Sequence, residues 1–247
     1  MLKKWPLISL LAATVLSLSA CSTTSLPSAN IAMDNTTNQY AADAKAEVQL
    51  GLAYLQRGEY PQAKAQLVNA ASIAPQLAQT HYALGYYYMK VKDTQRAKVQ
   101  YDKALAIAPH DPQVLNSYGV YLCEIGQYEQ SVQYFMQAIQ NQDFDHVGLA
   151  YENSGLCILK ANKKSQAMKY FVLATNHNPQ LAVSYYYLAL LSAQNQNYPA
   201  ARQYWHQYNQ LQKPNKASLE LGMVIARGLH DYEWIEQLQR QLDNLQS

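Results

Sequence analysis

Charged residues are scarce in this chain of 247 residues, at 15% against the roughly 25% of an average soluble domain. The 19 basic and 17 acidic residues almost balance. A protein that binds nucleic acid needs a basic surface to neutralise phosphates, so the composition gives no support for such a partner. Phenylalanine is also rare, with 3 residues, whereas tyrosine is abundant, with 21. Neutral polar residues and tyrosines therefore have to form much of the solvent-exposed surface.

Recognisable catalytic and metal-binding motifs are missing. The sequence contains no H-E-x-x-H pair, no glycine-rich phosphate loop and no G-x-S-x-G elbow. The histidines are His81, His110, His146, His177, His206 and His230. We expect His110-Asp111 and His230-Asp231 to lie in turns and to cap helices. The sequence predicts no catalytic residue, no metal or other cofactor and no small-molecule substrate.

No apolar run reaches the roughly 20 residues that a membrane-spanning helix needs. Leu7 to Leu18 form a shorter run, preceded by Lys3 and Lys4, and this pattern is typical of an export signal. Residues 18–21, LSAC, resemble the bacterial lipobox, which implies cleavage after residue 20 and lipidation of Cys21. The alternative is an ordinary signal peptide with Cys21 as a bystander. Ser22 favours sorting to the outer membrane.

Two predictions concern the chain after cleavage. The 19 basic residues less Lys3 and Lys4 leave 17, equal to the 17 acidic residues, so the mature protein is formally neutral. Residues 21–43 are rich in Ser, Thr, Asn and Asp and have no apolar periodicity. We expect them to form a flexible tether behind the lipid anchor.

From residue 44 to residue 247 the chain repeats. Gly51, Gly85 and Gly119 are spaced 34 residues apart, and Gly155, Ala189 and Gly222 continue the series. This period, with recurring small residues and closing prolines, is typical of the tetratricopeptide repeat. The sequence predicts an all-α, right-handed solenoid of six helix-turn-helix units. The expected units are 44–77, 78–111, 112–147, 148–181, 182–214 and 215–247.

Details within the units give further predictions. Gly58, Gly126 and Asn162 stand where a left-handed residue ends the first helix. The fifth unit is interpreted as degenerate, with Trp205 and Tyr208 in place of smaller residues.

Two cysteines remain in the repeats, Cys123 and Cys157, in neighbouring first helices. Their positions relative to the motif glycines differ by two residues, which rotates a helix by about 200°. One thiol can therefore face forward while the other faces back, and export places the chain in an oxidising compartment. A disulfide is favoured, and two buried free thiols are the alternative.

The first helices of such solenoids line a groove that binds partner segments. Tyr and Asn side chains suit recognition because they combine apolar area with hydrogen bonding. The groove candidates, counted from the motif glycines, are Gln49, Leu52, Tyr82, Tyr86, Asn116, Val120, Glu152, Asn153, Leu156 and Tyr186.

Four segments resemble the PilF/PilW family of outer-membrane lipoproteins for type IV pilus biogenesis and stability. They are LGLAYLQRGEYPQAK (50–64), VLNSYGVYLCEIGQYEQS (114–131), YENSGLCILK (151–160) and ARQYWHQY (201–208). The resemblance implies a lipid-anchored, non-catalytic scaffold at the periplasmic face of the outer membrane. Its partner would be the pilus secretin, whose localisation or multimerisation it promotes; some relatives stabilise fibres instead. Many members carry both cysteines, which supports a Cys123–Cys157 bridge.

Two other readings remain open on the sequence alone. One is a general periplasmic scaffold that docks cell-wall or outer-membrane assembly proteins. The other is a periplasmic enzyme with a site assembled only by the fold.

Overall fold

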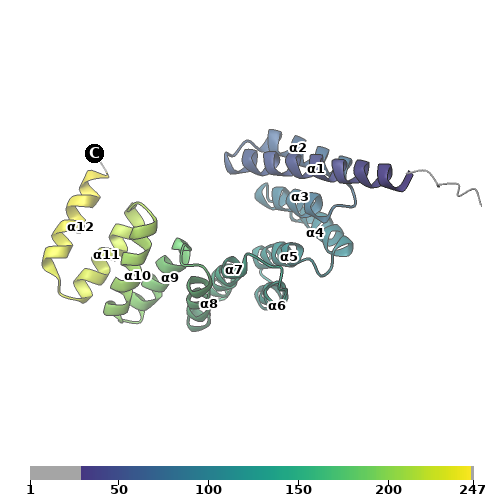
Figure 1. Cartoon of the computed structure of the whole chain (residues 1–247). Coiled ribbons are helices and arrows are strands. Elements are labelled where there is room, and N and C mark those ends of the chain that lie inside the picture. Colours follow the sequence, from purple (N-terminus) through teal and green to yellow (C-terminus); the bar gives the residue numbers. More distant parts are fainter. Residues whose placement is uncertain (1–28, 246–247) are drawn as a thin grey trace, which may run out of the picture. The chain divides into compact units, whose positions relative to one another are not determined.

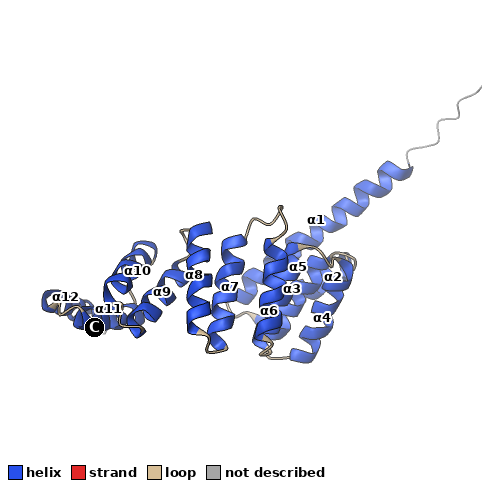
Figure 2. Cartoon of the chain, turned by 90° about the horizontal axis from the view of Figure 1, so that it is seen from below, coloured by secondary structure: helices blue, strands red, loops and turns tan. Residues whose placement is uncertain are grey.

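The computed structural model describes residues 29–245, and twelve helices account for the regular structure of that range (Figure 1). The helices of the first three units are α1 (Ala29–Gln56), α2 (Tyr60–Ile73), α3 (Ala78–Lys90), α4 (Thr94–Ile107), α5 (Pro112–Glu124) and α6 (Tyr128–Ile139). Those of the last three are α7 (Val147–Lys160), α8 (Lys164–His177), α9 (Ala182–Gln194), α10 (Tyr198–Leu211), α11 (Lys216–Gly228) and α12 (Tyr232–Asn244). Figure 2 shows helices and loops without a strand in this part of the chain. The fold is the predicted tetratricopeptide-repeat solenoid.

The first helix begins earlier than expected. Helix α1 starts at Ala29, so residues 29–43 are helical where the sequence analysis expected a flexible tether. The compact body begins at Asn38, and Ala44 and Val48 are the first fully buried side chains in it. Packing fixes the helix there, and the alanines at 41 and 42 extend it because alanine has the highest helix propensity. Cys21 and the export signal lie outside the described residues.

The two helices of a unit approach each other closely at the motif glycine. A Cβ atom on Gly119 would lie 2.7 Å from a ring carbon of Phe135, and one on Gly155 would lie 2.7 Å from a ring carbon of Phe171. Phe135 and Phe171 are almost completely buried in their own units. The 34-residue spacing of small residues therefore records where a large side chain of the second helix crosses the first.

The turn inside each unit contains one residue with positive φ. The expected residues Gly58, Gly126 and Asn162 have φ of 77°, 84° and 58°. The other three turns use non-glycine residues in the same conformation. These are Lys92, Gln196 and His230. The expected caps at Asp111 and Asp231 are also present, since each carboxylate accepts a hydrogen bond from a backbone N–H of the following helix.

The interpretation of Trp205 in the fifth unit as a replacement for a smaller residue is wrong. Trp205 does not replace a smaller residue, because the equivalent positions hold large side chains such as Phe135 and Phe171. Its ring instead reaches the next unit, where a Cβ on Gly222 would lie 3.0 Å from it. Trp205 Nε1–H donates to the Ser218 carbonyl over 2.6 Å. Trp205 thus joins the fifth unit to the sixth.

Candidate partner-binding groove

Two adjoining pockets on the first helices define the candidate site, which we call the groove. The N-terminal pocket has a volume of about 290 Å³ and receives side chains from α1, α3, α4 and α5. It is lined by Leu52, Gln56, Tyr82, Ala83, Tyr86, Tyr101, Asn116, Ser117 and Val120. Five of the ten predicted groove residues meet here: Leu52, Tyr82, Tyr86, Asn116 and Val120.

The central pocket adjoins the first one through Val120. Its volume is about 320 Å³, and α5, α6, α7 and α9 contribute to it. It is lined by Val120, Cys123, Glu124, Phe135, Asn153, Leu156, Leu159, Lys160 and Tyr187. Asn153 and Leu156 are predicted groove residues, so the structure brings seven of the ten candidates into one continuous surface.

Three tyrosines line the N-terminal pocket, namely Tyr82, Tyr86 and Tyr101. Burial, and secondarily the negative charge of Asp111, raises the pKa of Tyr82 to about 12, so its phenol stays protonated at physiological pH. Tyr86 is 37% exposed, and Lys90 Nζ lies 5.1 Å from the centre of its ring. These rings offer apolar area together with a hydroxyl group.

Two asparagines connect the pockets. Asn153 Nδ2 donates to Asn116 Oδ1 over 3.4 Å, from α7 to α5. A primary amide has two donor hydrogens and a carbonyl acceptor, so this bond uses only part of the capacity of each side chain. The groove therefore presents amide groups beside apolar pockets, the combination that an extended peptide requires.

Three predicted groove residues lie elsewhere. Gln49 is exposed on α1 and lines neither pocket. Glu152 is only 7% exposed, and its Oε2 accepts hydrogen bonds from the backbone N–H and the hydroxyl of Ser184 on α9. Burial raises the pKa of Glu152 above its ordinary value, and the two hydrogen bonds oppose that rise. Tyr186 packs against the rings of Tyr187 and Tyr208.

Three lining residues of the groove are not among the residues predicted from the sequence. Gln56, Glu124 and Lys160 occupy equivalent positions, each five residues after a motif glycine. Continuing the helical face by one more turn from Leu52, Val120 and Leu156 would have found them. In the fifth unit the lining residue is Tyr187 instead of Tyr186, a one-residue shift along the helix.

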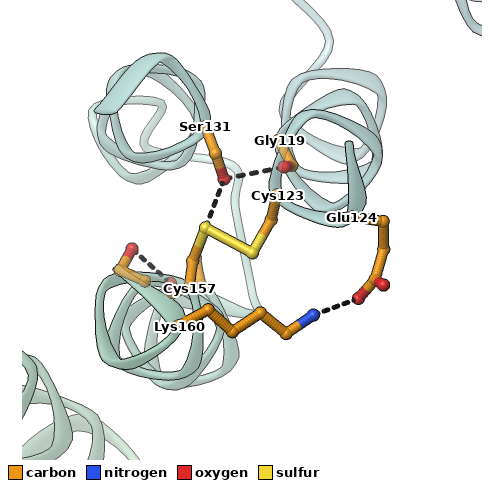
Figure 3. Close-up of a disulfide and its surroundings, with 8 residues drawn as sticks. Gly119, Cys123, Glu124, Ser131, Cys157 and Lys160 are labelled. Atoms are coloured by element: carbon orange, nitrogen blue, oxygen red, sulfur yellow. Dashed lines mark hydrogen bonds and ion pairs between the residues drawn. A yellow bond between two sulfur atoms is a disulfide. The ribbon is translucent and has the colours of Figure 1, made fainter. Parts of the chain in front are cut away.

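A disulfide joins Cys123 of α5 to Cys157 of α7, with their Cα atoms 5.6 Å apart (Figure 3). Ser131 donates to the Gly119 carbonyl over 2.7 Å, and its oxygen lies 3.3 Å from the sulfur of Cys157. Figure 3 also shows an ion pair between the same two helices, from Lys160 Nζ to Glu124 Oε1 at 2.7 Å. Both links border the central pocket.

Two other features are absent from the part of the chain that the structure covers, a cluster of metal-ligating side chains and a membrane-spanning helix. No group of three or more His, Cys, Asp or Glu residues is arranged to hold a metal ion between residues 29 and 245. In the same range no helix has the length and hydropathy to cross a membrane.

The fold and groove define a class of protein, the tetratricopeptide-repeat scaffolds that bind other proteins. Two family models described as tetratricopeptide repeats match the chain, at residues 78–111 and 100–133. Such scaffolds are generally non-catalytic.

Similarity to a known protein shows the family to which this scaffold belongs. The type IV pilus assembly protein PilF of Pseudomonas aeruginosa (strain PAO1) is 34% identical over 189 residues, which are 75% of this chain and 74% of that protein. The chain therefore belongs to the PilF family of type IV pilus assembly proteins.

Two solved structures have the same architecture. The structure of Pseudomonas aeruginosa PilF superposes with a TM-score of 0.73 at 33% identity and covers 84% of this chain and 93% of its own. PilW, described as a widely conserved type IV pilus biogenesis factor, gives a TM-score of 0.71 and covers 81% and 92%. Its 23% identity extends the likeness to the fold alone.

Proposed function

We propose that this protein is a non-catalytic scaffold of type IV pilus biogenesis that binds the pilus secretin through its groove. Membership of the PilF family carries the proposal. The groove supports it, because seven predicted residues form a surface of apolar, tyrosine and amide side chains. Such a surface can bind a protein segment by burying its side chains and hydrogen bonding its main chain.

The proposal includes the place of action. Lipidation of Cys21 would attach the chain to the periplasmic face of the outer membrane, where the secretin assembles. Confinement to that surface raises the effective concentration of the groove for secretin subunits without any new contact. The scaffold would thereby promote localisation or multimerisation of the secretin.

The test uses secretin multimers that resist sodium dodecyl sulfate. Their amount and membrane location are compared in wild-type cells, in deletion cells and in cells that carry Cys21→Ala. We expect deletion to abolish the multimers or misplace them. Cys21→Ala is expected to leave the repeats folded but to reduce correctly located multimers. Immunoblotting of fractions confirms that the variant protein is present.

Two outcomes would contradict the proposal. Normal multimers in the outer membrane of deletion cells would favour stabilisation of pilus fibres or a general periplasmic scaffold for cell-wall or outer-membrane assembly proteins. Normal multimers in Cys21→Ala cells, with the variant released from the membrane, would remove the role of the anchor. Complementation with the wild-type chain controls for effects on neighbouring genes.

A further inference from the structure

The central pocket has a construction that no other part of the described solenoid shares. Its walls come from α5 and α7, two first helices that a covalent bond holds together. Cys123 itself lines the pocket, and Cys157 is completely buried behind it. The disulfide thus ties one wall of the pocket to the other at the point where Cys123 lines it.

Two polar contacts also link α5 and α7, and both are weak; the other connection is the apolar core around Phe135, to which both helices contribute. The Asn153–Asn116 hydrogen bond is long, at 3.4 Å. The Lys160–Glu124 ion pair is about half exposed on both sides, and exposed pairs contribute about 0–1 kcal/mol. Without the disulfide, only these contacts and the apolar core around Phe135 position α5 against α7, and we expect the two helices to move more freely.

The charges around the pocket restrict what can bind in it. Glu124 and Lys160 are the charged residues of its lining, and they pair with each other at 2.7 Å. The lining thus has no net charge to neutralise an acidic or basic occupant. The rest is mainly apolar and aromatic, with Phe135, Leu156 and Tyr187 among the contacts. A volume of about 320 Å³ is at the lower end of ligand pockets and accepts one bulky side chain.

We propose that the central pocket binds one bulky apolar side chain of an uncharged, extended partner segment, and that it does so only while Cys123 and Cys157 are joined. The amides of Asn153, which lines this pocket, and of its partner Asn116 in the N-terminal pocket hydrogen bond the main chain of that segment. The identity of the partner rests on the proposed function; the chemistry of the pocket does not.

The first test uses a probe without any secretin. N-acetyl-phenylalaninamide is titrated into the purified mature chain with methyl groups labelled for NMR, and N-acetyl-lysinamide serves as the charged control. We expect saturable shifts of the Val120, Leu156 and Leu159 methyls at millimolar probe. The lysine compound is expected to leave these methyls unshifted. Shifts centred on other residues, or no saturable shifts, would overturn the proposal.

The second test asks whether the disulfide is required. Cys123→Ser combined with Cys157→Ser is expected to weaken probe binding at least about tenfold, equivalent to about 1.4 kcal/mol. Equal binding of the probe by the oxidised wild type and by this double variant would show that the pocket does not need the disulfide. That result would overturn the proposal. Circular dichroism verifies that the variant keeps its helices. Treatment of the wild type with a reductant repeats the test without any substitution.

The third test measures the effect of pocket variants on secretin multimers in cells. Leu156→Trp fills the pocket, whereas Leu173→Trp makes the same change at a 37% exposed position on α8, outside the groove. We expect loss of secretin multimers with the first variant and normal multimers with the second. Normal multimers with Leu156→Trp would overturn the proposal but leave the proposed function intact. Normal multimers in deletion cells would instead remove the proposed function, while the probe titration still decides the chemistry of the pocket.

Discussion

Two junctions between neighbouring repeat units are held together by different chemistry. At the α5–α7 junction a disulfide, a hydrogen bond and an exposed ion pair connect the helices. At the junction of the fifth and sixth units, the Trp205 ring is the central contact, beside an Asn215–Tyr208 hydrogen bond and an Arg202–Asp231 ion pair. Trp205 packs on Gly222, donates to the Ser218 carbonyl and lies edge-on to Trp234 at 5.1 Å between centroids.

The difference has a physical consequence. A disulfide needs an oxidising compartment, whereas an aromatic ring buried against a neighbouring helix is indifferent to redox state. The α5–α7 junction therefore depends on redox state, and it borders the groove. The junction of the fifth and sixth units does not depend on redox state, and it borders no part of the groove. A third junction, α7–α9, relies on the buried carboxylate of Glu152. Substitutions at these three places test the comparison.

The largest effect is expected from Trp205→Ala. The substitution removes a buried ring and its hydrogen bond to Ser218, and changes of this kind cost about 3–5 kcal/mol. Urea denaturation gives the loss of unfolding free energy, and hydrogen exchange locates it. We expect α11 and α12 to lose protection first.

The control for this variant is Val224→Ala, a truncation at a 49% exposed position on α11. It is expected to change the free energy of unfolding by no more than about 0.5 kcal/mol. If α11 and α12 keep their protection in Trp205→Ala, the ring does not hold the sixth unit and the interpretation of this junction is wrong.

Removal of the disulfide is expected to have the next largest effect. The two cysteines are 34 residues apart, and the loop-entropy relation then gives an upper value of about 4 kcal/mol for the stabilisation. The double variant with serine at both positions is compared with the wild type by urea denaturation, with and without reductant.

Two results make this comparison specific. Reductant is expected to destabilise the wild type but not the double variant or the C-terminal junction. Lys160→Ala removes the ion pair of the same junction and is expected to cost no more than about 1 kcal/mol, since that pair is exposed. A larger loss from Lys160→Ala than from the double variant would show that the disulfide is not the main link.

The smallest expected effect is a pH dependence at the α7–α9 junction. Because burial raises the folded-state pKa of Glu152, the folded protein holds this proton more tightly than the unfolded chain does. The associated stability is complete below the unfolded-state pKa and is lost as the pH rises through the folded-state pKa. Glu152→Gln keeps an oxygen acceptor for Ser184 and removes the charge, so it is expected to flatten this decline at pH values above the ordinary pKa of a glutamate.

The matched control is Glu236→Gln, which removes one carboxylate from an exposed position on α12. Urea denaturation of the wild type and both variants at a series of pH values gives the free energy of unfolding as a function of pH. A wild-type profile that matches the profile of Glu152→Gln would mean that the buried carboxylate does not shape the pH dependence.

Much of the architecture was predictable, because the repeat is a local rule. Each small residue at the motif position marks a helix crossing, and Gly119 with Phe135 shows the contact that imposes it. The turn residues were predictable only where glycine or asparagine signals the left-handed conformation. Lys92 and His230 adopt it without such a signal, since the two flanking helices force the turn.

The groove was predictable only in part, because helix rotation changes along the stack. A one-residue step turns a side chain by about 100°. This step separates Tyr187, which lines the central pocket, from Tyr186, which packs against the ring of Tyr208. It also separates half-buried Asn153, which lines the central pocket, from buried Glu152, whose partner Ser184 is 32 residues away in the chain.

The amino-acid sequence determined the helices, their pairing into six units and the period of the solenoid, because these follow from interactions between residues that are close in the chain. The tertiary structure decided which side chains reach the groove, how Trp205 crosses into the next unit, and that the wall of the central pocket contains Cys123. These depend on the angle between successive units, which arises from many packing contacts together and is not encoded at any single position.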